Sequence, residues 1–149
     1  MESKAQKYLK LATYNAQLFS KDPHTQVGAL LLAPDFSRIL STGINGFPRK
    51  LKKDDDLERW KRPQKYTWVA HAEVNAVCNA ARSGTSTDNC VAVITLFPCS
   101  SCAKMLIQAG IQHIYVPKSG CNHERLMEDF KVSKIMFEEV GVGITYLDE

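Results

Sequence analysis

Residues 91–102 read VAVITLFPCSSC, and this stretch decides the fold. Its first seven residues form a continuous apolar run of strand length, which is typical of a strand buried on both faces. Pro98 ends the run and predicts the start of a helix over 99–109, which Gly110 terminates. The stretch therefore indicates a buried strand that leads directly into a helix, with two cysteines in the first turn of that helix.

Strands and helices alternate on both sides of this stretch. Short apolar runs predict four further strands, over 27–33, 38–44, 111–116 and 144–147. Apolar residues at helical spacing predict three further helices, over 4–19, 71–82 and 124–140. The apolar face of the last helix is expected to consist of Leu126, Phe130, Ile135, Met136 and Val140.

The alternation predicts the fold class. We expect a single α/β domain over residues 1–149, with three layers and a mixed sheet of about five strands flanked by helices. The first two strands lie on either side of Pro34-Asp35, and they favour a hairpin. The later strand-helix-strand units favour parallel pairs joined by right-handed crossovers.

The composition excludes several protein classes. The chain has 149 residues, of which 44% are hydrophobic and 23% are charged. This balance excludes collagen-like, disordered and disulfide-scaffold proteins. No apolar run reaches the roughly 20 residues that span a membrane, and the N-terminus lacks the apolar core of a signal peptide. We therefore expect a cytoplasmic protein. The chain has five cysteines, an odd number, which in a reducing compartment indicates free thiols or metal ligands rather than disulfides.

Positive charge is concentrated in one segment. Residues 49–65 carry eight basic and four acidic side chains, a net charge of +4, whereas the whole chain carries +3. The segment lies within a long polar stretch over 46–68 that is expected to be a loop, and such loops are usually functional or disordered. The charge fits a solvated surface loop or attraction of a phosphorylated substrate.

Two short motifs carry the candidate chemistry, HAE at 71–73 and CSSC at 99–102, the second preceded by Pro98. The two cysteines are three residues apart on one predicted helix, so their sulfur atoms face the same side. One imidazole and two thiolates suit zinc, and three protein ligands leave the fourth position open, as in catalytic zinc sites. Glu73 is a candidate fourth ligand, but a carboxylate beside an activated water is more useful as a general acid and base.

A closed structural zinc site is the alternative, and it needs a fourth protein ligand. Cys78 lies seven residues after His71, about 10 Å along a helix, which is too far to share the ion. Cys90 and Cys121 lie in other predicted segments. The spacing therefore favours the open, catalytic arrangement.

A His-x-Glu motif together with Pro-Cys-x-x-Cys is the signature of zinc-dependent deaminases, in which the glutamate is not a metal ligand. On these motifs the sequence resembles the cytidine and deoxycytidylate deaminase superfamily, over roughly residues 21–147. Two further stretches, NGFPR at 45–49 and QAGI at 108–111, resemble its deoxycytidylate (dCMP) deaminase branch.

The resemblance implies a cytidine-deaminase-like fold and a reaction. The reaction is hydrolytic deamination of dCMP to dUMP with release of ammonia, at a cyclic amidine C–N bond, which supplies dUMP for thymidylate synthesis. His71, Cys99 and Cys102 would bind one catalytic zinc ion per chain. Glu73 would carry protons to N3 of cytosine and to the leaving amine.

The resemblance also implies substrate contacts. The backbone of Ala72 would contact O2 of the base, and the carbonyl of Pro98 would contact the exocyclic amine. Asn45 would meet the deoxyribose, and Val27 would pack on the ring. The candidates for phosphate recognition are Lys21, Arg49, Lys65, Tyr66, Tyr115 and Lys118.

Regulation and assembly are further implications. Ile44 stands where the regulated members of the family usually have tyrosine, in a stretch associated with allosteric dCTP and dTTP, and this departure argues against such regulation. Mg²⁺ bound with an allosteric nucleotide is a second candidate cofactor. We expect a homo-oligomer, either a dimer or a hexamer, whose partner is a small nucleotide rather than a membrane or a nucleic acid.

Three alternatives share these motifs. A deaminase could act on dCTP as well as on dCMP. It could instead act on a base in tRNA or single-stranded DNA, and four aromatic residues are available to stack on bases: Phe47, Trp60, Tyr66 and Trp68. In the third alternative the zinc site stabilises a non-enzymatic binding module, and a Glu73→Gln change is then harmless.

Overall fold

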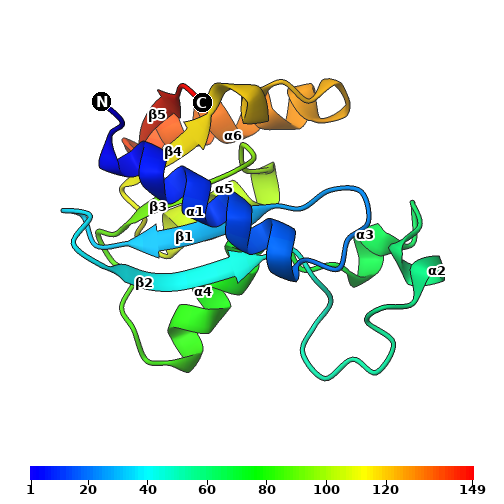
Figure 1. Ribbon diagram of the computed structural model, residues 1–149. Helices are drawn as coiled ribbons and strands as arrows, with labels where there is room; N and C mark the ends of the chain where they lie inside the picture. The colour runs from blue at the N-terminus through cyan, green and yellow to red at the C-terminus, as the bar shows by residue number, and fades with distance from the viewer.

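The chain folds into helices and strands that alternate along most of its length (Figure 1), and the computed structural model describes all of residues 1–149. The helices are α1 (Lys4–Phe19), α2 (Leu57–Trp60), α3 (Lys65–Trp68), α4 (Ala72–Arg82), α5 (Ser100–Gln108) and α6 (Met127–Val140). The strands are β1 (Gly28–Leu32), β2 (Ile39–Ile44), β3 (Val91–Ile94), β4 (His113–Pro117) and β5 (Gly143–Leu147). Two 3₁₀ turns, η1 (Lys118–Cys121) and η2 (Glu124–Leu126), precede α6.

The five strands form one mixed sheet in the order β2-β1-β3-β4-β5. β1 pairs antiparallel with both β2 and β3, whereas β3, β4 and β5 are parallel neighbours. The predicted hairpin, the parallel units and the number of strands are thus confirmed. None of the helices is long and apolar enough to cross a bilayer.

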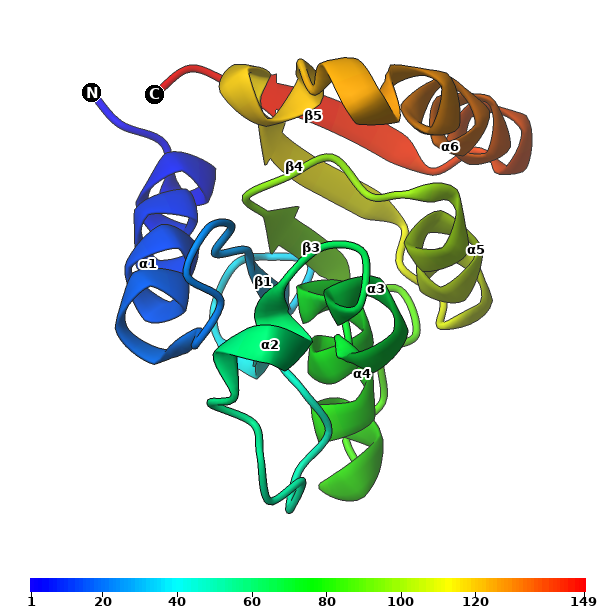
Figure 2. The ribbon, with the colours of Figure 1, turned by 90° about the vertical axis from the view of Figure 1, so that its right-hand side faces the viewer.

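Helices cover both faces of the sheet (Figure 2). On one face, Leu9 and Ala12 of α1 pack against Leu30, Leu32 and Val93. On the other face, α4, α5 and α6 bury a larger core against the same strands. This is the predicted three-layer arrangement, and β1 and β3 are buried along their whole length because they lie between the two layers of helices.

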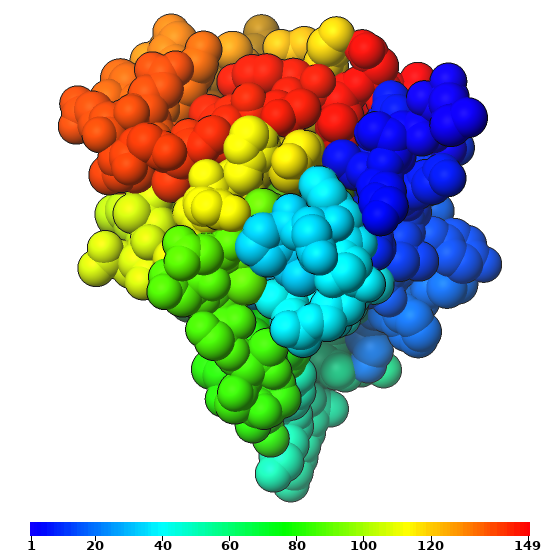
Figure 3. Space-filling model, turned by 90° about the vertical axis from the view of Figure 1, so that its left-hand side faces the viewer, coloured from blue at the N-terminus to red at the C-terminus, as the bar shows by residue number.

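The two ends of the sheet differ in what they carry. Figure 3 shows the end at which β3 begins, where the turn between β1 and β2 (cyan) lies beside α1 (blue). At the opposite end β3 runs into α5, and α4 begins nearby. Gly43 of β2 sets the position of α4, because a Cβ atom there would lie 2.1 Å from the carbonyl oxygen of Ala72. Only glycine allows this close approach of strand and helix.

The polar stretch over 46–68, expected to be a loop, contains the short helices α2 and α3. Asp56 caps α2 by accepting a hydrogen bond from the backbone N–H of Glu58. Trp60 is buried, and its ring stacks on Phe47 with centroids 4.0 Å apart. Tertiary packing of these aromatic rings therefore orders a segment whose local sequence indicates only polarity.

The predicted apolar face of the last helix is wrong in part. The helix buries Phe130, Ser133 and Phe137, whereas Ile135 and Val140 are exposed. Apolar residues occur on several sides of this helix, so spacing alone does not identify the buried side. Leu126 belongs to η2 and packs at the edge of the core.

Candidate active site and metal centre

The two motifs meet at the carboxyl end of β3, where α4 and α5 begin. His71 is the N-cap of α4, Cys99 is the N-cap of α5, and Cys102 lies in the first turn of α5. Nδ1 of His71 lies 3.5 Å from Sγ of Cys99 and 3.4 Å from Sγ of Cys102. The three ligand atoms all lie within 4.8 Å of one another, which is close enough to hold a single ion.

The donor set fits zinc, for which one imidazole nitrogen and two thiolates are ordinary ligands. No other group of three or more His, Cys, Asp or Glu side chains in the chain is close enough to hold a metal. No fourth protein ligand joins the cluster, which argues against the closed structural site. The Mg²⁺ ion considered with an allosteric nucleotide likewise finds no cluster of acidic ligands.

Contacts inside the cluster shift the pKa values of its members. The pKa of Cys99 is lowered mainly because the thiol of Cys102 donates a hydrogen bond to it, and the pKa of Cys102 is raised because it is that donor. The pKa of His71 is raised chiefly by its contact with Cys99. Cys99 lies at the start of α5, where the helix macrodipole favours a thiolate.

Glu73 lies in the first turn of α4 and is only 5% exposed. Burial raises the pKa of its carboxyl group from the ordinary value to about 7. A carboxyl group that titrates near neutral pH can both accept and donate a proton under physiological conditions. The residue is thus suited to carry protons beside the His71, Cys99 and Cys102 cluster.

A cavity of about 190 Å³ opens beside this cluster. Its lining includes buried Glu73, half-buried Cys99 and exposed His71 at one end, which we call the buried end after Glu73. The exposed side chains of Tyr66 and Arg125 lie at the other end, the mouth. A wider groove of about 790 Å³ lies between α1, β2 and α4, but none of the three cluster residues lines it. The smaller cavity is therefore the candidate active site.

The sequence model of the cytidine and deoxycytidylate deaminase zinc-binding region matches residues 2–118, which is most of the chain. The chain belongs to this family. A probable deoxycytidylate deaminase of Caenorhabditis elegans is 39% identical over 139 residues, which cover 91% of this chain and 65% of that protein. The deoxycytidylate deaminase of Homo sapiens is 34% identical over 141 residues, which cover 91% and 74% of the two chains.

Solved structures agree with this assignment. The crystal structure of dCMP deaminase from the cyanophage S-TIM5 in complex with dCMP and dUMP matches with a TM-score of 0.71 and 26% identity, covering 99% of both chains. The chain is accordingly an enzyme of the deaminase class with a cytidine-deaminase-like fold.

The smaller cavity, of about 190 Å³, brings together most of the residues expected to contact a substrate base and sugar. The predicted residues that line it are Val27, Asn45, Lys65, Tyr66, His71, Ala72, Glu73 and Cys99. Pro98 is fully buried, directly before Cys99 in the chain. The backbone positions expected to contact the base, at Ala72 and Pro98, therefore flank the metal ligands.

Four predicted phosphate contacts lie outside this cavity. Lys21 and Arg49 line the wider groove, where Lys21 forms an ion pair of 2.8 Å with Asp54 and Arg49 contacts Asn79. Lys118 forms an ion pair of 2.7 Å with Asp148. The ring of Tyr115 lies against Phe36, on the side of the sheet that α1 covers. The structure does not bring these four side chains together.

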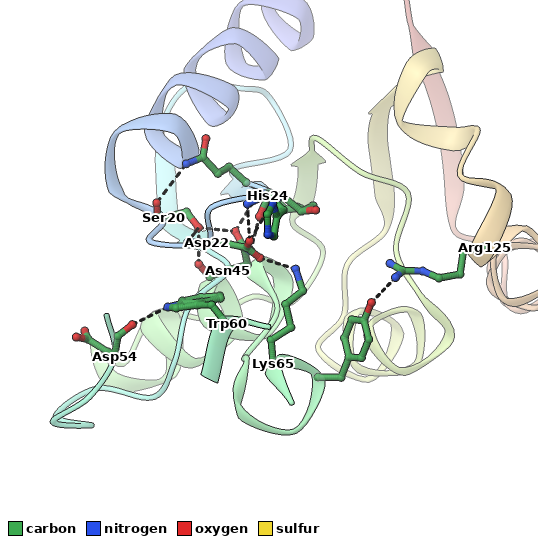
Figure 4. A network of polar contacts seen from close by, with 12 residues as sticks. Ser20, Asp22, His24, Asn45, Asp54, Trp60, Lys65 and Arg125 are labelled. Atoms are coloured by element: carbon green, nitrogen blue, oxygen red, sulfur yellow. Dashed lines mark hydrogen bonds and ion pairs between the residues drawn. The ribbon is translucent and has the colours of Figure 1, made fainter. Parts of the chain in front are cut away.

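Two arginines that the sequence reasoning missed line the cavity, Arg62 and Arg125. Arg125 donates a hydrogen bond to the hydroxyl oxygen of Tyr66, across the mouth of the cavity (Figure 4). The basic charge of residues 49–65 was a signal for Arg62. No local pattern points to Arg125, because only the fold brings η2 beside α3.

Proposed function

We propose that this chain catalyses hydrolytic deamination of dCMP, with water consumed and dUMP and ammonia formed. The observation that carries the proposal is the position of Glu73 beside the His71, Cys99 and Cys102 cluster, at the buried end of a cavity with two arginines at its mouth. The names of the relatives from C. elegans and H. sapiens and the bound nucleotides of the cyanophage structure support the same substrate. Its product would supply thymidylate synthesis.

The chemistry at the buried end is assigned to four side chains. His71, Cys99 and Cys102 would hold zinc, which when bound lowers the pKa of water at its open position. Glu73 accepts a proton from the attacking water and transfers it to N3 of cytosine, while the water oxygen bonds to C4. Glu73 then takes the remaining proton of that oxygen and passes it to the amine nitrogen, which leaves C4 as ammonia and leaves a carbonyl group there. Its pKa of about 7 suits both directions of transfer.

The base and sugar are assigned to the walls of the cavity, and Asn45, which lines it, would meet the deoxyribose. The backbone of Ala72 contacts O2 of the base, and the carbonyl oxygen of Pro98 accepts a hydrogen bond from the exocyclic amine. Val27, which is buried beside the cavity, packs on the ring.

The 5′-phosphate is assigned to Arg62 and Arg125. Both line the cavity, and neither forms an ion pair with a carboxylate, whereas Lys65 pairs with Asp22. Guanidinium groups bind phosphate through paired hydrogen bonds, and the hydroxyl of Tyr66 lies beside Arg125. This arrangement favours a nucleotide over a nucleoside.

A polynucleotide substrate has less support. Phe47 stacks on Trp60 and lies against Trp68, so three of the four aromatic rings considered for base stacking pack on one another. None of these three rings lines the cavity, and Tyr66 alone of the four does.

The test is ammonia release from purified protein given dCMP, dCTP, deoxycytidine and CMP in parallel. We expect rapid turnover of dCMP and slow turnover of deoxycytidine. Equal turnover of dCTP would show that the phosphate end is open. No turnover of any of the four by zinc-loaded protein, with deamination of a cytosine-containing oligonucleotide, would overturn the proposal. The predicted homo-oligomer is tested on the same sample by analytical ultracentrifugation.

A further inference from the structure

One ion pair of the molecule is buried, and it lies in the wall of the cavity. Nζ of Lys65 lies 2.9 Å from Oδ2 of Asp22, and the two side chains are 5% and 1% exposed. The other five ion pairs all join side chains that are at least 40% exposed. Burial of two charges is unfavourable unless further hydrogen bonds satisfy them, so the partners of this pair indicate what it holds together.

Through Asp22, the ion pair is connected to the segment 20–27. Its Oδ1 accepts hydrogen bonds from the backbone N–H groups of His24 and Thr25, at 2.9 and 3.1 Å. Its Oδ2 accepts from Lys65 and, at 3.3 Å, from the amide of Asn45 (Figure 4). Burial alone raises the pKa of Asp22, but the hydrogen bonds from Lys65 and the backbone outweigh burial and hold the pKa below its ordinary value. The carboxylate is thus built into the wall as an anion.

Asn45 completes this side of the network. Its Oδ1 accepts hydrogen bonds from Ser20 and from the backbone N–H of Val27, and its Nδ2 donates to the carbonyl oxygen of Thr25 and to Asp22. The hydroxyl of Ser20 lies 2.9 Å from both Oδ1 and the backbone oxygen of Asn45, so these two acceptors share its one hydrogen. Asn45 therefore holds the segment 20–27 in place, and its expected contact with the deoxyribose stays a prediction.

Through Lys65, the ion pair is connected to the mouth segment, which we define as residues 62–66. Lys65 is the first residue of α3 and its only buried residue, and the N-cap Gln64 makes no side-chain capping bond. A helix of four residues is not stable in isolation. The flanking residues Arg62 and Tyr66 line the cavity. The contact with Asp22 is thus the buried attachment of the segment that carries both side chains.

We propose that Asp22 and Lys65 are positioning residues, whose buried pair holds the mouth segment so that Arg62 and Tyr66 face the phosphate-bearing end of the substrate. This inference rests on the proposed function. It differs from the expectation that Lys65 itself binds phosphate, because the ammonium group of Lys65 faces a carboxylate 2.9 Å away.

The two roles of Lys65 are separated by Asp22→Asn, which removes the carboxylate and leaves the lysine. A positioning role predicts at least a tenfold rise in KM for dCMP, with kcat within threefold of the parent and kcat/KM for deoxycytidine unchanged. A direct phosphate contact predicts an unchanged or lower KM, because Lys65 is released from its partner. That outcome overturns the inference, and so does an equal fall of kcat for both substrates, which indicates only loss of folded enzyme.

The matched control is Asp54→Asn. It breaks the exposed pair of Asp54 with Lys21, which joins the same segment 20–27 to the part of the chain that precedes the mouth segment. We expect KM for dCMP to stay within twofold of the parent. A rise as large as that of Asp22→Asn would show that any ion pair in this region has the effect, and it would overturn the specific role of the buried pair.

Asp22→Asn leaves the charge of Lys65 buried without a partner. If this variant does not fold, a second variant and a second measurement test the same inference. The double variant Asp22→Asn/Lys65→Met contains no buried charge at this position. Chymotrypsin cleavage after Tyr66 and Trp68 under native conditions is expected to accelerate at least tenfold in it. An unchanged cleavage rate shows that the pair does not hold the mouth segment. This readout does not depend on turnover, whereas absence of dCMP turnover in the parent protein refutes the proposed function alone.

Discussion

The two ends of the cavity are built in different ways. At the buried end, the three cluster residues and Glu73 belong to two short motifs at the starts of α4 and α5, and these helices pack on the sheet. At the mouth, Arg62 and Tyr66 are held by contacts between distant parts of the chain, Lys65 with Asp22 and Tyr66 with Arg125.

This difference separates two tasks. Chemistry at C4 of the base needs ligands and a proton carrier in fixed geometry, which rigid helix starts provide. Under the proposed function, recognition of the substrate's other end depends on the mouth segment, in which only Lys65 is buried and which changes more easily than the core. Damage to the buried end should therefore reduce kcat for every substrate, whereas damage to the mouth should change the preference between substrates.

The largest effect is expected from loss of the metal. The Cys102→Ala variant should bind no zinc and show no detectable ammonia release, because an imidazole and one thiolate do not hold the ion. Removal of zinc from the parent by a chelator should have the same effect, and added zinc should restore activity. Zinc content by atomic absorption is the measurement, with Cys121→Ala as the control that keeps one zinc per chain. Full activity of the zinc-free protein would contradict the assignment of the buried end.

Glu73→Gln should have the next largest effect. The amide keeps the shape of the side chain but cannot carry a proton, so kcat should fall by roughly 10²- to 10⁴-fold. Zinc content and the melting temperature should be close to those of the parent. Glu128→Gln, on the exposed side of α6, is the control with unchanged kcat. Parental turnover by Glu73→Gln would contradict the assignment of proton transfer to Glu73.

Arg125→Ala tests the mouth directly. Loss of a charged hydrogen bond of about 1.5–3 kcal/mol should raise KM for dCMP by roughly tenfold to a hundredfold. Turnover of deoxycytidine should not change, because it has no phosphate. Lys131→Ala removes one positive charge from the neighbouring surface of α6 and should leave KM unaltered. If both substrates lose activity equally, the mouth and the buried end are not separate in function.

The same contrast explains how far sequence reasoning reached. The strand at Val91 and the helix after Pro98 were predicted from local spacing, and both lie in place. The meeting of His71 with the two cysteines joins residues at least 28 apart, and it was predicted from the deaminase signature rather than from spacing. The pair of Asp22 with Lys65 joins residues 43 apart, and the contact of Tyr66 with Arg125 joins residues 59 apart. No local pattern encodes such contacts, so two arginines of the cavity were missed and four other side chains were expected there.

The smallest effect is expected at His113, which lies outside both ends of the cavity. Its Nε2 lies 2.7 Å from Oγ1 of Thr145, and burial lowers the pKa of its imidazole below the ordinary value of 6.5. The unfolded chain therefore takes up a proton at a higher pH than the folded chain. The contribution of His113 to the free energy of unfolding is complete above pH 6.5 and decreases as the pH falls towards the folded pKa.

The test compares the parent with His113→Gln by thermal unfolding between pH 8 and pH 5. The difference between them cancels the titration of other groups, Glu73 included, and it should shrink as the pH falls below about 6.5. The kcat of His113→Gln for dCMP at neutral pH should equal that of the parent. A difference in stability that grows on acidification would mean that the folded protein stabilises the imidazolium, which is opposite to the effect of burial. A fall in kcat would show that the active site also depends on the contact between His113 of β4 and Thr145 of β5.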